Sequence, residues 1–346
     1  MLIITKSLHV INYQLDEIFP REISESFREY VLELVNHIRN NPSVRAYKST
    51  STTTEVIRCA LDILENKDSD DIISTRTENI SKRLLSKEQE AQRRVERLST
   101  NIQKGSLIQA LIQDEANDNT YYLLAKVDHS EFVDDDTFTF KSGFSKDKKN
   151  IWKSCLLDIS NTDTDIFYAK VYTNNSAKYW SEGFLELVPI ESNESNTIKA
   201  FKSIDGLLGA TIKKTAPSDY TVIRNSVISY FKNVDPFDYS DMLETLIRNY
   251  DPTELSRDDL SSLIGKFEGL PEKKKFDRQF SPVPSAIKAH IKKIYEVNSG
   301  IKLQVTDEVD DIRNTITAFV DGDTGQQYLR IKVTNQDTFN MFKNNN

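Results

Sequence analysis

Cysteine and histidine are scarce in this sequence. Its 346 residues include two cysteines, Cys59 and Cys155, and four histidines. Two cysteines in a chain of this length cannot form a disulfide framework, so the composition favours a reducing, cytoplasmic environment. The histidines are scattered: His9, His37, His129 and His290. Because structural zinc sites need closely spaced ligand pairs, we predict no metal site and no cofactor.

Long hydrophobic runs are also absent. No stretch of about 18 apolar residues occurs, so we expect no membrane span and no membrane partner. The first residues, MLIITKSLHVINYQL, alternate between apolar and polar and lack a small-residue cleavage site, which favours a first strand over a signal peptide. Hydrophobic residues make up 38% of the chain and charged residues 28%, as in a soluble globular protein, and the length favours two domains.

Familiar catalytic motifs are missing as well. There is no P-loop, no Gly-x-Gly-x-x-Gly, no His-Glu-x-x-His and no Gly-x-Ser-x-Gly elbow. Asp158, Asp163 and Asp165 suggest a magnesium-dependent nuclease, because carboxylates bind hard cations that clamp phosphates. Asp163 and Asp165 lie in a predicted turn, however, where aspartate commonly bonds to nearby backbone. We favour the turn interpretation there, as for Asp321 and Asp323, and assign no catalytic residue.

The net charge of −8 argues against a generic polyanion binder, since DNA affinity comes largely from cationic contacts to phosphates. Basic residues nevertheless cluster late in the chain. The candidate DNA-binding residues are Lys273, Lys274, Lys275, Arg278, Lys288, Lys292 and Lys293. An acidic protein can carry such a basic patch. The alternative, that these cations only solvate a linker and one helix face, carries equal weight.

The spacing of apolar residues predicts an α+β fold. Helical spacing covers Ser24–Ile38, Thr52–Leu64 and a long charged segment, Glu78–Leu98. Strand-like runs begin at Gly105. They are Ser106–Gln113, Thr120–Asp128, a short run at Phe138 and Phe140, Trp152–Ile159 and Ile166–Tyr172. These runs predict an antiparallel sheet of about five strands, joined by the first strand and covered by helices.

An aromatic segment follows the last of these strands. Tyr179, Trp180, Phe184 and Leu185 recur at helical spacing. Such aromatic side chains could stack on bases, as they do in single-strand binders. Their apolar neighbours favour packing in the core instead.

The remainder of the chain predicts a helical middle segment and a small C-terminal β-sheet. Amphipathic helices are expected at Tyr220–Phe231, Phe237–Tyr250 and Leu255–Phe267. Gly269–Pro284 is expected to be a linker and Ser285–Tyr295 a basic helix. Three strands should then form one sheet: Ile301–Val305, Ile316–Val320 and Tyr328–Val333. The predicted domains are residues 1–175 (α+β), 176–270 (helical) and 271–346 (basic helix and sheet).

One pattern of apolar and aromatic spacings resembles a known family. In chain order it comprises Leu157-Asp158-Ile159, Tyr168, Ala169, Val171, Tyr179-Trp180, Phe184-Leu185 and Asn196-Thr197. This is similar to the central signature of the bacterial 37-kilodalton nucleoid-associated proteins, the NdpA-like family. Similarity at low identity extends over most of the chain, through His9, Ile11, Gly105–Val127, Phe276-Asp277 and Gly300–Leu303.

The resemblance implies nucleoid association and DNA binding, and it carries over no catalytic residue. The long charged helix before Gly105 and the lack of a strongly basic region depart from the family, so DNA binding could be reduced, or conferred by a partner protein or a homo-oligomer.

Three functions therefore compete. The first is a non-enzymatic, sequence-tolerant DNA-associated protein of the nucleoid, with contacts through the lysine-rich span. The second is an interaction subunit of a multi-protein system, for example of antiviral defence, whose acidic surface and exposed charged helix bind a basic partner. The third and least favoured is the metal-dependent nuclease.

Overall fold

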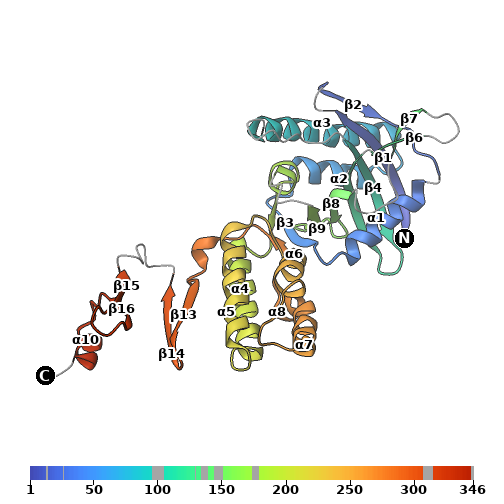
Figure 1. The fold of residues 1–346 in the computed structure, drawn as a ribbon. Coiled ribbons are helices and arrows are strands. Elements are labelled where there is room, and N and C mark those ends of the chain that lie inside the picture. Colours follow the sequence, from blue (N-terminus) through green and yellow to red (C-terminus); the bar gives the residue numbers. More distant parts are fainter. Residues whose placement is uncertain are drawn as a thin grey trace.

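An eight-stranded antiparallel sheet forms the N-terminal part of the protein in the computed structural model, which describes residues 1–12, 15–25, 27–95, 105–128, 130–133, 139–143, 151–173, 179–306 and 315–343 (Figure 1). The strand order is β10-β3-β9-β8-β5-β4-β1-β2. The strands are β1 (Leu2–Asn12), β2 (Glu17–Pro20), β3 (Arg45–Ser49), β4 (Gly105–Asp114), β5 (Asn119–Asp128), β8 (Ile151–Asp158), β9 (Tyr168–Thr173) and β10 (Leu187–Pro189). The predicted α+β class is confirmed, and the first strand joins the sheet beside β4.

Both faces of this sheet are covered, which explains why its central strands read as nearly continuous apolar runs. In β4, Leu107 and Leu111 pack into one cluster while Ile108 and Ile112 pack into another on the opposite face. This alternation follows the two-residue period of a strand. Helix α1 (Phe27–Asn40) covers one face, whereas α2 (Glu55–Glu65), α3 (Asp70–Val95) and the π-helix η3 (Tyr179–Phe184) cover the other.

Several N-terminal elements differ from the sequence prediction. Helix α3 starts at Asp70, before the expected Glu78, and its first turn carries acidic residues that suit a helix N-terminus. The predicted third strand appears as β7 (Phe140–Gly143), which pairs with β6 (Ser130–Val133) outside the main sheet. The expected strand position Phe138 and the expected helix end at Leu98 lie outside the described residues. Strands β2, β3 and β10 were not predicted, because each is at most five residues long.

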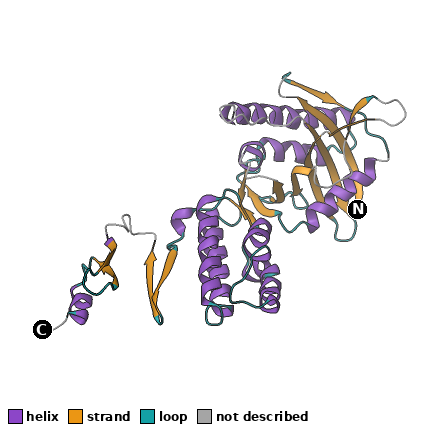
Figure 2. Cartoon of the chain, in the orientation of Figure 1, coloured by secondary structure: helices purple, strands orange, loops and turns teal. Residues whose placement is uncertain are grey.

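The helical middle part, whose helices are drawn in Figure 2, has its own hydrophobic core. Its helices are α4 (Asn193–Thr211), α5 (Pro217–Asn233), α6 (Tyr239–Leu243), the π-helix η4 (Glu244–Arg248), α7 (Arg257–Glu268) and α8 (Leu270–Lys274). Phe276 and Phe280 are buried in this core, and Phe280 stacks on Phe237 where β12 (Gln279–Phe280) pairs with β11 (Phe237–Asp238). The expected linker over Gly269–Pro284 is therefore wrong, since this segment closes the helical core.

The predicted basic helix over Ser285–Tyr295 is also wrong. A 3-10 turn, η5 (Pro284–Ala286), is followed by strand β13 (Lys292–Asn298). The side-chain amide of Asn225 donates to the Lys292 carbonyl oxygen at 2.5 Å and accepts from the Lys292 backbone N–H at 3.0 Å. This pairing imitates a neighbouring strand, and the β-branched and aromatic residues of β13 favour extended backbone.

The C-terminal strands form two separate two-stranded sheets instead of the one three-stranded sheet expected. Strand β13 pairs with β14 (Ile301–Thr306), and β15 (Ile316–Val320) pairs with β16 (Gln327–Ile331). A short helix, α10 (Gln336–Phe342), follows. None of the helices in the described part of the chain is long and apolar enough to span a membrane.

The aromatic segment after β9 belongs to the core, as predicted. Trp180 and Phe184 are fully buried, with ring centroids 4.9 Å apart. We expect Trp180→Ala to lower the free energy of unfolding by about 3–5 kcal/mol, because it removes a large buried aromatic side chain. Urea unfolding measures this effect. The control is Tyr168→Ala, which removes an exposed aromatic residue of β9; equal effects of the two substitutions would contradict the burial of Trp180.

Asp219 is a second buried anchor and ties α5 to the loop before α7. Its carboxylate accepts bonds from the Tyr250 hydroxyl at 2.7 Å and from the backbone N–H groups of Thr253, Glu254 and Leu255 at 2.7–3.0 Å. Burial acts to raise the pKa of Asp219, but these donors outweigh it and hold the pKa well below its ordinary value.

Because the folded-state pKa is lowered, the stabilisation is present above the unfolded pKa of about 4 and is lost as pH falls below it. We expect Asp219→Asn to cost about 2–3 kcal/mol at neutral pH and to flatten the fall in stability below about pH 5. Urea unfolding at several pH values tests this, with the exposed Asp258→Asn as control. A variant with the same acid-side slope as the unaltered protein would show that Asp219 does not set it.

Candidate nucleic-acid interface

A basic groove of about 880 Å³ lies between α4 and the α7–α8 segment. One wall is a row on α4 with helical i, i+4 spacing, Lys202, Gly206 and Ala210, accompanied by Ser203 and Leu207. The other wall continues the same spacing through the break between α7 and α8. It consists of Gly265, Lys266, Gly269, Leu270, Lys273 and Lys274. We call this feature the basic groove.

Lysine is the one charged residue type among the described residues that line the basic groove. All four lysines are exposed, and no salt bridge between described residues involves them. Neighbouring acids are paired with arginines instead. Glu268 contacts Arg248 at 2.9 Å and Glu272 contacts Arg278 at 2.9 Å, while Asp205 contacts Arg224 at 2.8 Å. The positive potential of the groove is therefore left uncompensated locally.

Small residues keep the basic groove open. No neighbouring atom lies within 4 Å of the position that a Cβ would take on Gly206, Gly265 or Gly269. Larger side chains at these positions would project into the space between the walls. A ligand can thus approach the helix backbones closely while the lysine side chains reach it from both sides.

Only some of the seven candidate DNA-binding residues line the basic groove. Lys273 and Lys274 line the basic groove, whereas Lys275, Lys288, Lys292 and Lys293 do not. Arg278 is engaged elsewhere: its guanidinium binds Glu272, donates to the Glu268 carbonyl oxygen at 3.1 Å and lies 5.5 Å from the Tyr239 ring centroid.

Sequence analysis missed two lysines of the groove, Lys202 and Lys266. Lys202 belongs to the i, i+4 row Lys202-Gly206-Ala210 on α4, and Lys266 to the row Lys266-Leu270-Lys274 that runs from α7 into α8. That periodic row was the available signal, but the two rows are far apart in the sequence and meet only through the fold.

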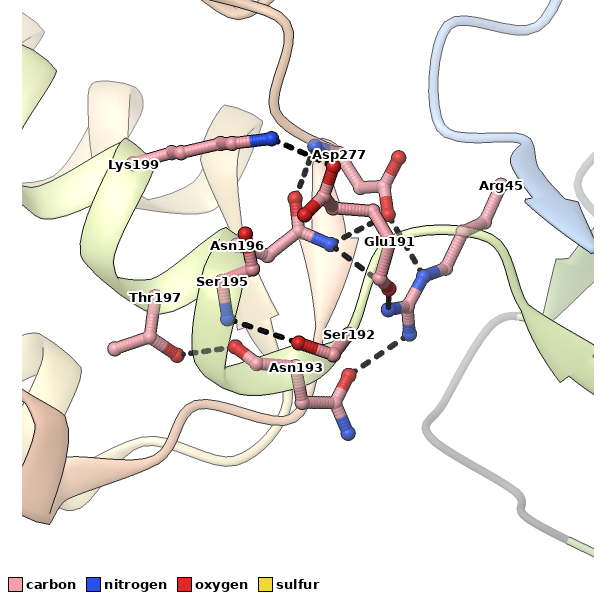
Figure 3. A network of polar contacts seen from close by, with 9 residues as sticks. All are labelled: Arg45, Glu191, Ser192, Asn193, Ser195, Asn196, Thr197, Lys199 and Asp277. Carbon is pink, nitrogen blue, oxygen red and sulfur yellow. Dashed lines mark hydrogen bonds and ion pairs between the residues drawn. The ribbon is translucent and has the colours of Figure 1, made fainter.

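A second polar cluster joins the sheet to the helical part (Figure 3). From β3, the Arg45 guanidinium donates to Asp277 Oδ2 at 2.8 Å, to Asn193 Oδ1 at 2.9 Å and to the Glu191 carbonyl oxygen at 2.6 Å. Asn196 donates its amide to Asp277 Oδ2 at 2.6 Å and accepts from the Asp277 N–H at 2.8 Å. We call this cluster the Arg45 junction.

Asn196, Thr197 and Asp277, which belong to the family-like pattern, thus have a structural role. Asn196 and Thr197 are fully buried at the start of α4. The Thr197 hydroxyl donates to the Asn193 carbonyl oxygen at 2.7 Å and accepts from the Val283 N–H at 3.0 Å. The Asn-Thr pair and Asp277, distant in sequence, fix the same corner of the fold.

The charged helix α3 is packed against the sheet. Glu88 on α3 forms an ion pair with Lys126 on β5, and both side chains are buried. Lys153 on β8 lies 5.2 Å from the Tyr179 ring centroid. Burial, together with the nearby charge of Glu88, raises the pKa of Tyr179. Glu88 therefore anchors one face of α3 on the sheet, whereas the same helix keeps an exposed charged face that includes Asp70, Asp71, Lys82, Arg93 and Arg94.

Two of the aspartates considered for metal binding, Asp158 and Asp321, use their carboxylates for hydrogen bonds within turns. Asp158 Oδ1 accepts from the Ser160 N–H at 3.0 Å and the Ser160 hydroxyl at 2.5 Å, and Asp321 Oδ1 accepts from the Asp323 and Thr324 N–H groups. The Asp163 N–H donates to Asn161 Oδ1 at 3.0 Å. Across the described residues, no group of three His, Cys, Asp or Glu side chains is arranged to hold a metal ion.

No protein-family model matches this chain, and a search of curated proteins finds no match. The similarity to the NdpA-like family therefore stays a prediction from the sequence pattern.

The Arg45 junction yields a stability prediction. We expect Arg45→Met to lower the free energy of unfolding by about 3 kcal/mol, because Asp277 would keep its partly buried charge without the cationic partner. Lys199→Met is the control, since it breaks only the more exposed pair with Glu191 and should cost less than about 1 kcal/mol. Chemical denaturation measures the free energy of unfolding of both variants. Similar losses would show that the Arg45 junction does not stabilise the fold.

Proposed function

We propose that this protein is a non-enzymatic, DNA-associated protein that binds the phosphate backbone in the basic groove. The observation that carries the proposal is the convergence of four uncompensated lysines, Lys202, Lys266, Lys273 and Lys274, on one open groove of an otherwise acidic chain. Lysine ammonium groups act as point charges for phosphate, and each such interaction releases counterions from DNA.

Sequence-tolerant binding fits the chemistry of the groove. Bidentate recognition of base edges relies on arginine, asparagine or glutamine side chains. None of these is among the described residues that line the basic groove, and neither is an aromatic residue on which a base could stack. Lysine, serine and glycine suit the sugar-phosphate backbone, which carries no direct sequence information.

The acidic character of the rest of the chain is compatible with this role. A net charge of −8 repels DNA from most of the surface, while the groove supplies a local positive field. Repulsion elsewhere would orient the protein so that the groove faces the nucleic acid. A nucleoid location in the cytoplasm is part of the same proposal.

The competing hypothesis of an acidic interaction subunit depended on an exposed charged helix. That helix, α3, is anchored on the sheet through Glu88, and its exposed charged residues are of both signs instead of acidic: Asp70, Asp71, Lys82, Arg93 and Arg94. The basic groove therefore provides better support for DNA association than α3 provides for a basic protein partner.

The test is DNA affinity as a function of salt. In one variant Lys202, Lys266, Lys273 and Lys274 are all changed to Gln. We expect its affinity for duplex DNA to fall and its log–log salt slope to shrink by about 0.9 for each phosphate that is no longer neutralised. Fluorescence anisotropy between about 50 and 200 mM salt, on two unrelated DNA sequences, measures both quantities.

A charge-matched control uses the lysines outside the groove. Changing Lys275, Lys288, Lys292 and Lys293 to Gln alters the net charge equally and should leave most of the affinity and slope in place. If this control weakened binding as much as the groove variant, the groove would not be the binding surface. Absence of measurable binding by the unaltered protein would reject the DNA function and favour the interaction-subunit hypothesis.

A further inference from the structure

The elements after Ile291 bury little of their apolar surface. We call β13, β14, β15, β16 and α10 the C-terminal module, which extends away from the helical part in Figure 1. Every residue of β16 is exposed, and α10 has no buried residue. The large hydrophobic side chains exposed in the module are Ile294, Tyr295, Val297, Ile301, Phe319, Val320, Tyr328, Leu329, Ile331, Val333, Phe339, Met341 and Phe342.

The β15–β16 hairpin presents one aliphatic face. Ile316 pairs with Ile331 and Ala318 with Leu329, and residues at alternate positions of a strand point to the same side. Val320 completes this face and is 62% exposed. The opposite face is different in kind, with Phe319 stacked on Tyr328 and Arg330 placed over the Phe319 ring. An aliphatic face of this kind is normally covered by another layer.

Neither hairpin of the module has the architecture of an independently stable sheet. A two-stranded sheet is marginal in water, and three strands or a packed helix are usually needed. No third strand pairs with either two-stranded sheet within the described residues. Helix α10 is seven residues long, shorter than helices that persist without tertiary packing. The C-terminal module therefore needs to pack against another surface to be stable.

The exposed area is sufficient for a stable interface. The apolar residues on the aliphatic side of β15–β16 and on α10 are Val320, Leu329, Ile331, Val333, Phe339, Met341 and Phe342. Taking about 200 Å² for a large apolar side chain, their exposed fractions correspond to roughly 800 Å² per module. A standard interface buries about 800 Å² on each partner. A partner that covered this whole surface would thus reach the size of a specific complex.

Charge is compatible with contact between identical modules. Residues 292–346 contain seven Lys and Arg and eight Asp and Glu, a net charge of −1, while the whole chain carries −8. Two copies can approach through this region without the repulsion that the rest of the acidic surface would impose.

We infer that the C-terminal module is a homodimerisation element whose partner is the same module of a second copy of this chain. A two-fold interface would bring the aliphatic faces of the two β15–β16 hairpins together, with the α10 residues Phe339 and Phe342 closing the rim. This inference does not rest on the DNA-binding proposal, because the module and the basic groove share no residue.

The test is the mass of the full-length protein in solution. The unaltered chain should sediment, and scatter light, as a dimer of its 39.8 kDa protomer. Leu329→Lys with Ile331→Lys should give a monomer, because the paired lysines would be buried without counter-charges. Phe339→Glu with Phe342→Glu should weaken the dimer without touching the hairpin, which guards against a hairpin that simply fails to fold.

Leu15→Lys is the matched control, because it places a lysine on an exposed apolar residue between β1 and β2, in the N-terminal part of the protein. It should remain dimeric. The melting of the sheet and helical cores should be the same in all variants, since the module contributes to neither. A monomeric unaltered protein, or a dimer that survives both double substitutions, would overturn the inference; the first result would assign the surface to a different protein.

Discussion

The Arg45 guanidinium is the contact on which the arrangement of the parts depends. Its planar fork donates to three acceptors in two segments: Asp277 after α8, and Asn193 and the Glu191 carbonyl oxygen at the start of α4. Through these bonds, β3 of the sheet holds the start of α4 and the segment after α8. Because α4 and α8 are opposite walls of the basic groove, one arginine in the sheet also orients the candidate site. A lysine could not replace it, since an ammonium group lacks the fixed geometry of the fork.

The sequence predicted those elements whose periodicity is long enough to be recognised. Strands β4 and β5 and helices α2, α5 and α7 carry clear two- or 3.6-residue patterns, and all were anticipated. Strand β3 was not, because Arg45–Ser49 is short and mixes charge with one aromatic residue. The helix predicted over Ser285–Tyr295 does not form. The side-chain amide of Asn225 bonds to the backbone of Lys292, and this tertiary contact favours a strand there. Such contacts between distant residues leave no local signature.

The candidate site shows the same limit. Lys273 and Lys274 were found because they are neighbours in a lysine-rich span, whereas Lys202 and Lys266 join them only through helix packing. Counting charges along the chain also gave equal weight to Arg278, whose charge is balanced by Glu272. The relevant quantity is the charge that stays uncompensated on one surface, and ion pairing in the fold determines it.

The two proposals, if both hold, have a joint physical consequence. The basic groove lies in the helical part and the dimerisation element after Ile291, so a dimer would present two grooves without covering either. Four lysines per groove would give a modest, salt-sensitive affinity for DNA at physiological ionic strength. Linking two such sites raises the effective local concentration and can increase overall affinity by about 10²–10⁴ without any new contact. An acidic chain could thus associate with DNA through a few well-placed lysines, because two copies would act together.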